Sequence, residues 1–350
     1  MALVRDILLW PAAMIYGSVV AMRNMLYDHG LLRSHEFPLP VICVGNITAG
    51  GTGKTPHVTY LAGRLSEMTQ VAVLSRGYRR KSKGFRPVTP DSTVSLSGDE
   101  PLQMARRLNR ARVFVDRDRV HGVSEIMKTA TTVETVILDD GFQHRSVKAG
   151  LNILLTSYNR LMTRDRLLPL GMLRENLHGT KRADIIIVTK TPQDITEEET
   201  DLIRREISPG PRQSLFFTSL AYRKPVPLFV PAGREITTGT AILLVTGIAE
   251  PAPLLGYLRG LAGSVTHLSF PDHHSFTDSD LRRITAAFDL ISAGEKLIIT
   301  TEKDGVRLKE ITNIADHVRE SMYYLPVGIE FIRDEEIFMK KITGYAGKHS

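Results

Sequence analysis

Residues 45–56 read GNITAGGTGKTP, follow the apolar stretch 40–44 and precede a helix-like segment at residues 55–68. Gly50, Gly51 and Gly53 lack a Cβ, so the backbone can turn tightly and point several N–H groups at an anion. Lys54 adds a mobile positive charge, and the Thr55 hydroxyl suits a phosphate-bound Mg²⁺ at the start of a helix. This order of elements predicts a loop that binds a nucleoside triphosphate through Thr48, Ala49, Gly50, Gly51, Thr52, Gly53, Lys54 and Thr55.

One position departs from the strict G-x-x-x-x-G-K-[ST] pattern, because Thr48 stands where that pattern has its first glycine. The alternative interpretation of the segment is a flexible glycine-rich surface turn. The strand before the loop and the helix after it favour the phosphate-binding interpretation, since a bare G-K-T triplet would be weak evidence.

Length and composition limit what this loop can belong to. The chain has 350 residues, of which 42% are hydrophobic and 24% charged, so it is globular and long enough for two domains. A net charge of +7 favours anionic partners without distinguishing nucleotide, nucleic acid and lipid. The single cysteine, Cys43, allows no internal disulfide, which fits a reducing compartment.

Strand-like and helix-like segments alternate along the chain. Apolar runs at residues 40–44, 71–74, 112–115, 135–138, 151–155 and 184–188 have helical segments such as 55–68 and 119–129 between them. This alternation predicts an α/β fold, a doubly wound and mostly parallel sheet covered on both faces. A turn-rich stretch at 208–212 and an extended, proline-interrupted stretch at 215–230 suggest a ribbon or hinge. A second strand and helix series then follows at 241–245, 265–270, 281–291 and 296–300.

These patterns predict four parts. Residues 1–36 form an apolar N-terminal helix and its linker, and residues 37–212 form the nucleotide-binding domain. Residues 213–240 form the interdomain ribbon, and residues 241–350 form a smaller α/β domain whose C-terminal segment returns to the first domain.

The N-terminal segment 7–22 (ILLWPAAMIYGSVVAM) carries no charge. As a helix, its 16 residues would span about 24 Å, less than the roughly 30 Å of a bilayer's hydrocarbon core. A transmembrane span is therefore disfavoured, and export by a signal peptide would separate the phosphate loop from its nucleotide. Docking at a membrane interface is favoured over a helix packed only on the domain. The run 76–86 holds six basic and no acidic residues, and it is either a solvated loop or a patch that faces phosphates or headgroups.

Three polar motifs carry candidate chemistry. Residues 136–140 (VILDD) end an apolar strand in Asp139 and Asp140, which after a phosphate loop are better interpreted as Mg²⁺ ligands than as turn formers. Asp99 in 97–101 (SGDEP) reads by itself as a cap of the following helix. In 271–276 (PDHHSF), paired histidines without further zinc-spaced ligands leave acid–base work or orientation of a carboxylate as their role, before a helix that Thr277 or Asp278 could cap.

The combined motifs resemble the tetraacyldisaccharide 4′-kinase family of lipid A biosynthesis in Gram-negative bacteria. The motifs cover most of the chain from residue 45 to residue 304 in the family's order: GNITAGGTGKTP, SRGY at 75–78, SGDEP, LDDGFQHR at 138–145, LPLGMLRE at 168–175, FPDHHSF at 270–276 and TEKD at 301–304. The resemblance implies an ATP- and Mg²⁺-dependent enzyme that phosphorylates the 4′-hydroxyl of a tetraacylated glucosamine disaccharide 1-phosphate. It also implies a peripheral protein on the cytoplasmic face of the inner membrane, attached by its N-terminal helix, with neither nucleic acid nor an obligate protein as a partner.

The resemblance also assigns roles to single residues. Lys54 and Thr55 match the phosphate-loop lysine and the Mg²⁺-facing threonine, and Asp139 and Asp140 match the acidic pair near the metal. Glu175 matches a glutamate associated with Mg²⁺-ATP. Asp99 matches the proposed general base, and His273 matches the partner of that base. Arg76 and Arg119 resemble basic residues near the substrate phosphates.

Two other classes of protein share part of this pattern. A GTPase switch or a metallochaperone NTPase should carry an N/T-K-x-D motif after a strand, but residues 189–192 (TKTP) lack the aspartate and residues 301–304 (TEKD) have the wrong spacing. A non-catalytic membrane scaffold with a vestigial loop is disfavoured, because candidates for both the metal ligands and the base are present.

Overall fold

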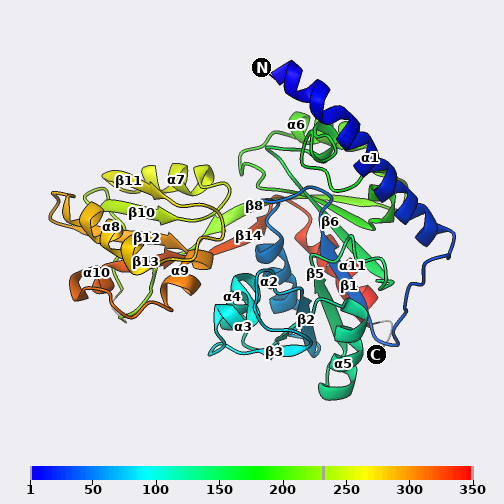
Figure 1. Ribbon diagram of the computed structural model, residues 1–350, viewed down its shortest axis with the longest axis horizontal. Helices are drawn as coiled ribbons and strands as arrows, with labels where there is room; N and C mark the ends of the chain where they lie inside the picture. The colour runs from blue at the N-terminus through cyan, green and yellow to red at the C-terminus, as the bar shows by residue number, and fades with distance from the viewer. Residues whose placement is uncertain (1, 231–232, 348–350) are drawn as a thin grey trace.

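The computed structural model describes residues 2–230 and 233–347 and has two lobes that lie side by side (Figure 1). Each lobe is built on its own sheet, one of nine strands and one of five among the described residues. The predicted α/β architecture with a mostly parallel main sheet is confirmed. Residues 231–232 of the predicted ribbon, residues 348–350 of the predicted second domain and residue 1 lie outside the described residues.

The larger sheet has the strand order β14-β8-β7-β6-β1-β5-β2-β4-β3, with antiparallel pairs only where β14 meets β8 and β3 meets β4. Residues of β1, β2, β5 and β7 are buried throughout, as expected for parallel strands covered on both faces. The strands are β1 Val41–Gly45, β2 Val71–Ser75, β3 Arg86–Val88, β4 Arg112–Val115, β5 Thr135–Asp139, β6 Leu151–Ser157, β7 Ile185–Thr189, β8 Ser214–Tyr222 and β14 Val327–Phe331.

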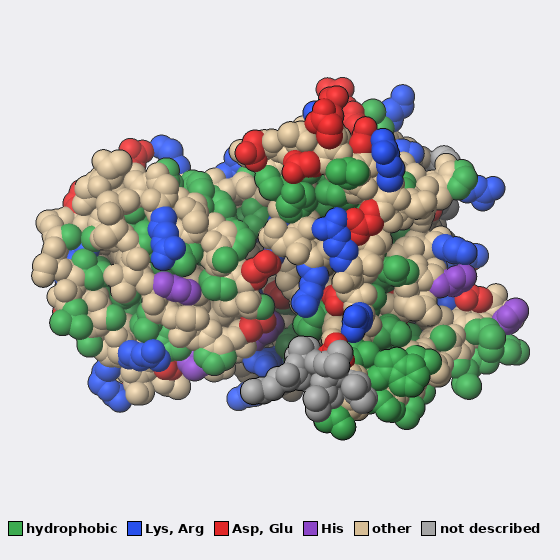
Figure 2. Space-filling model, turned by 90° about the horizontal axis from the view of Figure 1, so that it is seen from above, with side chains coloured by type: hydrophobic (Ala, Val, Ile, Leu, Met, Phe, Trp, Pro, Cys, Tyr) green, Lys and Arg blue, Asp and Glu red, His purple; other side chains and the backbone are tan. Residues whose placement is uncertain are grey.

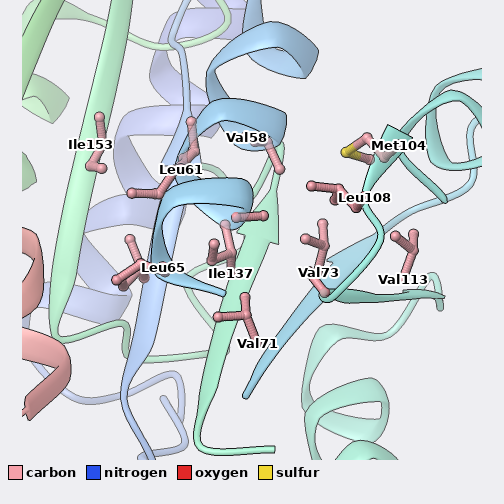
Figure 3. Packing of buried hydrophobic residues seen from close by; sticks show 14 of the residues in the cluster. Val58, Leu61, Leu65, Val71, Val73, Met104, Leu108, Val113, Ile137 and Ile153 are labelled. Atoms are coloured by element: carbon pink, nitrogen blue, oxygen red, sulfur yellow. The ribbon is translucent and has the colours of Figure 1, made fainter. Parts of the chain in front are cut away.

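Helices cover both faces of this sheet. On one face, α2 (Lys54–Leu65), α4 (Asp99–Arg107) and α11 (Glu335–Ala346) pack on one apolar cluster. Val58, Leu61 and Leu65 of α2 recur at helical spacing and point at the sheet (Figure 3). On the other face lie α5 (Arg119–Thr129) and α6 (Glu197–Ile207), which belong to two separate clusters. The sheet is therefore doubly wound, and its carboxyl edge is left for the site.

The smaller lobe has the strand order β11-β10-β12-β13-β9, parallel except for β9. A capping box formed by Thr277 and Asp280 begins α8, so Thr277 is the cap of the two candidates. The strands are β9 Val226–Pro227, β10 Ala241–Thr246, β11 Ser264–Ser269, β12 Lys296–Thr301 and β13 Met322–Leu325; the helices are α7 Ala252–Arg259, α8 Asp278–Asp289, α9 Glu302–Leu308 and α10 Asp316–Glu320.

The chain passes between the lobes twice. It leaves the larger sheet through β8, enters the smaller sheet at β9, and returns from β13 to β14, which pairs with β8 (Figure 1). After β14, α11 inserts Phe338, Ile342 and Ala346 into the core that α2 also lines. The C-terminal segment thus completes the larger lobe.

The N-terminal helix α1 runs over Ala2–Asp28, 27 residues, and lies across the outside of the larger lobe (Figure 1). It is longer than the uncharged segment 7–22, because charged residues at both ends find partners on the lobe: Asp6 pairs with Arg166 and Asp28 with Arg145. Among the described residues, no helix combines the length and apolarity needed to cross a bilayer.

The packing of α11 gives a stability prediction. Ile342 is fully buried, whereas Ile337 on the same helix is 52% exposed. We expect Ile342→Ala to lower the free energy of unfolding of the larger lobe by about 2–5 kcal/mol, because truncation leaves a cavity. Ile337→Ala is the matched control and should change it by less than about 0.5 kcal/mol. Urea denaturation followed by fluorescence measures both, and equal effects would mean that α11 is not part of this core.

Candidate active site

The phosphate loop follows β1 and ends where α2 begins at Lys54. Gly50, Gly51 and Gly53 have φ of 83°, 48° and 76°, values that L side chains rarely adopt. The loop is held from below, because the Asn46 side chain donates to the Thr52 hydroxyl (2.7 Å) and the Thr189 hydroxyl donates to the Thr52 carbonyl (3.0 Å). This anchoring leaves Gly50 and Gly51, which are exposed, and the start of α2 facing the lobe junction.

Thr48 and Ala49 form the outer arm of the loop. The Ala49 amide donates to the Met172 carbonyl at 2.6 Å, and the Arg174 amide donates to the Ile47 carbonyl at 2.7 Å. Thr48 is buried and forms an isolated antiparallel bridge with Leu173. The segment 168–175 is therefore a wall of the phosphate loop, which explains why a threonine suffices at position 48: its backbone is fixed by pairing rather than by a glycine turn.

Lys54 lies beside the predicted acidic pair. Its Nζ is 3.2 Å from Asn46 Oδ1, to which it donates, and 3.5 Å from Asp140 Oδ1. Asp140 has φ of 51° and is also 3.3 Å from Arg174. Burial favours its protonated form, but Lys54 and Arg174 outweigh burial and lower the pKa of Asp140 below its usual range. The carboxyl end of β5 thus faces the start of α2.

Asp139 behaves differently from its neighbour. It is 2% exposed, and its Oδ2 accepts a hydrogen bond from the Ser75 hydroxyl at 2.8 Å. Burial, together with the negative charges of Glu100 and Asp140, raises the pKa of Asp139 to about 6. Its other oxygen, Oδ1, is buried without a hydrogen-bond partner among the described residues. Such an atom is suited to a cation ligand.

Asp99 and His273 meet across the lobe junction. His273 Nδ1 is 2.9 Å from Asp99 Oδ2, although the residues lie on α4 and on the loop after β11. Asp99 is not the helix cap, because Gly98 holds the N-cap position and Asp99 is the first residue of α4, where its Oδ1 accepts from the Glu100 amide at 2.9 Å. The residue is therefore buried with its carboxylate turned to the other lobe.

Positive charges of the second lobe surround this carboxylate. Burial alone would raise the pKa of Asp99, but the hydrogen bond from His273 and the charges of Lys303 and Arg307 on α9 lower it to about 2. Arg307 lies 3.5 Å from Asp99 Oδ2 and 3.1 Å from Asp304 Oδ1. The TEKD motif thus brings the charge of Lys303 to the site, and Arg307 follows one helical turn later. The sequence pattern predicts a role for neither residue, since only the fold brings α9 next to α4.

Three other predicted residues lie in different surroundings. Glu175 is buried, and its described contacts go to Arg182 (2.9 Å), Asn24 (3.1 Å) and Gln143 (3.1 Å) rather than to Lys54 or the aspartate pair. Arg119 is 1% exposed and donates to the carbonyls of Asp116 (2.5 Å) and Asp139 (2.9 Å), so it supports the end of β5 from inside. Arg76 is exposed after β2.

The basic run 76–86 also contains both buried and exposed side chains. Arg80 is 3% exposed, and its guanidinium donates to the Gly84 carbonyl at 2.6 Å, so it closes the loop internally. Arg79 donates to the His273 carbonyl at 3.1 Å. Part of the run is therefore structural, and Arg76 is among its exposed members.

A cavity of about 240 Å³ lies between the lobes above the phosphate loop. Its polar lining includes Gly53, Lys54 and Thr55 from the larger lobe and Asp272 and Lys303 from the smaller lobe. Its apolar lining comes from Leu220, Tyr222, Ile248, Ala249, Pro253, Leu254, Leu325 and Val327. An ion pair between Lys190 and Glu250 bridges the lobes beside Gly51.

A second cavity of about 740 Å³ lies below the end of α1, lined by Tyr27, Arg33, His144, Arg145 and Arg182 among others.

This geometry agrees with what the chain is similar to. The family model described as tetraacyldisaccharide-1-P 4′-kinase (LpxK) matches residues 5–346. The chain belongs to this family. The family membership favours the kinase interpretation over the GTPase switch and the metallochaperone.

Individual relatives and one solved structure support the same assignment. Tetraacyldisaccharide 4′-kinases of Phocaeicola vulgatus and Bacteroides thetaiotaomicron are 45% and 44% identical, each over 98% of this chain and over 95% and 93% of their own lengths. The crystal structure of the "apo" form of LpxK from Aquifex aeolicus in complex with ATP is 29% identical with a TM-score of 0.74, covering 97% of this chain and 98% of that one.

The donor set fits a magnesium ion in part. Asp139 Oδ1 is a buried oxygen without a hydrogen-bond partner in the described part of the chain. Asp140 adds carboxylate oxygens directly after β5, and Thr55 adds a hydroxyl in the first turn of α2. Within residues 2–230 and 233–347, no three His, Cys, Asp or Glu side chains gather into a ready-made metal cluster. This is the expected pattern for Mg²⁺, which is commonly held by one or two carboxylates together with substrate phosphates.

The raised pKa of Asp139 gives a prediction about stability against pH. The folded protein binds this proton more tightly than the unfolded chain, so stability falls as pH rises from about 4 to about 6 and stays lower above that range. We expect Asp139→Asn to raise the free energy of unfolding at pH 7.5 by up to about 3 kcal/mol, and the gain to disappear below about pH 4. Denaturation at several pH values with a chelator present measures it, and Asp201→Asn on exposed α6 is the control. A pH-independent difference would contradict the assigned environment.

Proposed function

We propose that this chain transfers the γ-phosphate of ATP to the 4′-hydroxyl of a tetraacylated glucosamine disaccharide 1-phosphate presented at a membrane surface. The observation that carries the proposal is the hydrogen bond between His273 and Asp99, formed across the lobe junction. The residues next to this pair, Glu100 and Asp272, line the same cavity as the phosphate loop. A carboxylate held near a phosphate loop by a second lobe is the arrangement that a kinase with an alcohol acceptor needs. Its relatives carry the corresponding name.

ATP would occupy the cavity between the lobes. The loop amides and Lys54 would hold the β- and γ-phosphates, because glycines leave the amides free and α2 begins at that point. The apolar wall that includes Leu220, Ile248 and Leu254 would take the base, which has large non-polar faces. Lys190, paired with Glu250 beside Gly51, closes this side of the cavity.

Thr55, Asp139 and Asp140 would hold Mg²⁺ together with the phosphates. The ion neutralises phosphate charge and helps align the triphosphate when bound. Glu175 contributes indirectly in this arrangement, since it orients Gln143, whose amide also donates to the Asn46 carbonyl at 2.7 Å. Arg76 is one of the exposed cations of the run 76–86 and would contact the substrate's phosphate, and buried Arg119 supports the Asp139 backbone.

Asp99 would accept the proton of the sugar hydroxyl as its oxygen attacks the γ-phosphorus and ADP departs in line. A carboxylate whose pKa is about 2 is a weak base for an alcohol. Because the transition state of phosphoryl transfer is loose, the proton leaves late, and orientation of the hydroxyl matters more than basicity. The smaller lobe would separate from the larger one about the two places where the chain crosses between them, after β8 within the predicted ribbon 213–240 and before β14. Separation would release product, and closure would bring His273 back to Asp99.

The test of the proposal is a transfer assay. ATP labelled at the γ-phosphate is offered with the acylated disaccharide 1-phosphate in vesicles, and the position of the label in the product is determined. We expect label at the 4′-oxygen, and Asp99→Asn to lower kcat by about 10²- to 10⁴-fold, because the amide keeps the shape but cannot accept the proton. Asp201→Asn is the matched control. A near-normal kcat for Asp99→Asn would reduce Asp99 to a structural residue, and label on another atom would overturn the proposed acceptor.

We further propose that α1 attaches the protein peripherally to the cytoplasmic face of the inner membrane. Its outward side carries Leu8, Trp10, Met14, Ile15, Val19, Met22 and Met25, all at least half exposed. Figure 2 shows hydrophobic side chains gathered over α1 at the edge of the larger lobe. A contiguous apolar strip of this kind suits the boundary between headgroups and acyl chains, where the substrate's sugars also lie.

Substitutions on the outward side of α1 test this attachment without removing the helix. Ile15, Val19 and Met22 are each 60% exposed or more. We expect the triple change of these residues to Ser to weaken co-sedimentation with anionic vesicles by at least about 100-fold, since each loses most of the transfer free energy of its side chain. Leu202→Ser with Leu290→Ser, exposed elsewhere, is the control. Undiminished binding by the triple variant would assign the attachment to another surface.

A further inference from the structure

Lys303 is the second residue of α9, and its ammonium group lies behind His273 on the side away from Asp99. Lys303 Nζ is 3.0 Å from His273 Nε2, 3.1 Å from Glu100 Oε1 and 3.7 Å from Asp272 Oδ1. The side chain is 17% exposed. Glu100 belongs to α4 of the other lobe, so the contact spans the junction, as the contact between His273 and Asp99 does.

The chemistry of these contacts fixes the hydrogen on the imidazole. An ammonium group has three donors and no acceptor, so the His273 Nε2 that faces it must present its lone pair. A neutral imidazole carries one hydrogen, which is then on Nδ1 and is donated to Asp99 Oδ2 at 2.9 Å. The hydrogen bonds therefore run in one direction: Lys303 donates to His273, and His273 donates to Asp99.

We propose that Lys303 is a positioning residue of the phosphoryl transfer, which holds His273 as the neutral Nδ1–H tautomer and thereby orients Asp99 toward the sugar hydroxyl. The inference rests on the proposed function for its catalytic consequence, but the assignment of the tautomer does not. While the Lys303 ammonium donates to Nε2, that nitrogen cannot carry a hydrogen, so the contact selects the Nδ1–H tautomer.

The tautomer of His273 matters because the hydrogen on Nδ1 is the one that reaches Asp99. With the hydrogen on Nε2, the ring would present a lone pair to Asp99 and could donate to Asp272, which lies 3.9 Å away. The groups that face or touch His273 are Asp99 on α4, Asp272 beside it, Lys303 on α9, and Tyr78 and Arg79 after β2; Arg307 on α9 faces Asp99. Of these, Lys303 is the cation in contact with the ring nitrogen that must stay unprotonated.

Lys303 also lines the cavity that holds Lys54 and Thr55. The same ammonium group therefore borders the pair of Asp99 and His273 on one side and the proposed triphosphate site on the other. This placement explains why a lysine rather than a neutral donor suits the position, since a flexible stem with three donors can contact both.

The primary test observes the imidazole directly. In ¹⁵N-labelled protein without nucleotide, the His273 signals are identified by their loss in His273→Gln. We expect the Nδ1–H tautomer in the native protein at pH 7.5. In Lys303→Met we expect the Nε2 position to carry the hydrogen in part of the molecules, as a mixture of the two neutral tautomers. A native protein with the hydrogen on Nε2, or a Lys303→Met variant with unchanged His273 signals, would overturn the inference.

The second test measures kinase activity. Lys303→Met should lower kcat by about 10- to 100-fold, with a smaller change in KM, because the reacting groups are misplaced. Lys303→Arg, which keeps a donor and a charge, should restore most of kcat, and exposed Lys309→Met is the control.

The two tests separate the possible failures. A purely structural role for Lys303 would lower kcat or the melting temperature but leave the tautomer of His273 in place, which overturns the inference. Absence of transfer to the disaccharide by native protein, with the expected His273 signals, would instead sink the proposed function and leave the tautomer assignment standing.

Discussion

The site depends on one geometric constraint, that the carboxyl edges of two separate parallel sheets face each other. The larger sheet brings the phosphate loop and Asp139 to its edge, and the smaller sheet brings His273 and Lys303 to its own. The contact between the edges is held firmly. His273 keeps φ of 57°, a conformation that costs about 1–3 kcal/mol, while its amide donates to the Gly247 carbonyl at 3.2 Å and its carbonyl accepts from Arg79.

Two equally buried carboxylates have opposite electrostatic states at this junction. Asp99 has its pKa lowered to about 2 and Asp139 has its pKa raised to about 6, although both are less than 5% exposed. The difference arises from neighbours, because Asp99 faces cations of the second lobe whereas Asp139 has Ser75 and two acidic residues nearby. Environments that separate pKa values in this way are typical of groups with different roles. The charge state of Asp99 is thus set by the lobe that closes on it.

The sequence predicts what depends on local pattern. Uninterrupted apolar runs identify the buried strands, and the rule that parallel strands end at one edge places Asp140 next to Lys54. The contact of Asp99 with His273 came from family resemblance, since the two residues are 174 positions apart. Contacts that only the tertiary fold creates were not predictable from pattern: Lys303 behind His273, and the pairing of Glu175 with Arg182. Polar partners at both ends also extend α1 beyond its uncharged segment.

The N-terminal helix is part of the site as well as of the surface. On its inward side, the Tyr16 hydroxyl donates to the Arg174 carbonyl at 2.8 Å, and Asn24 donates to Glu175 at 3.1 Å. The Arg174 amide in turn donates to the carbonyl of Ile47 in the phosphate loop. Arg174 therefore connects the helix directly to the loop that would hold the nucleotide. Each of these hydrogen bonds is worth about 0.5–1.5 kcal/mol, enough together to couple the position of α1 to that of the loop. A force on the helix from a bilayer would therefore act on the wall of the phosphate loop itself, so the proposed membrane attachment and the proposed nucleotide site would be mechanically connected.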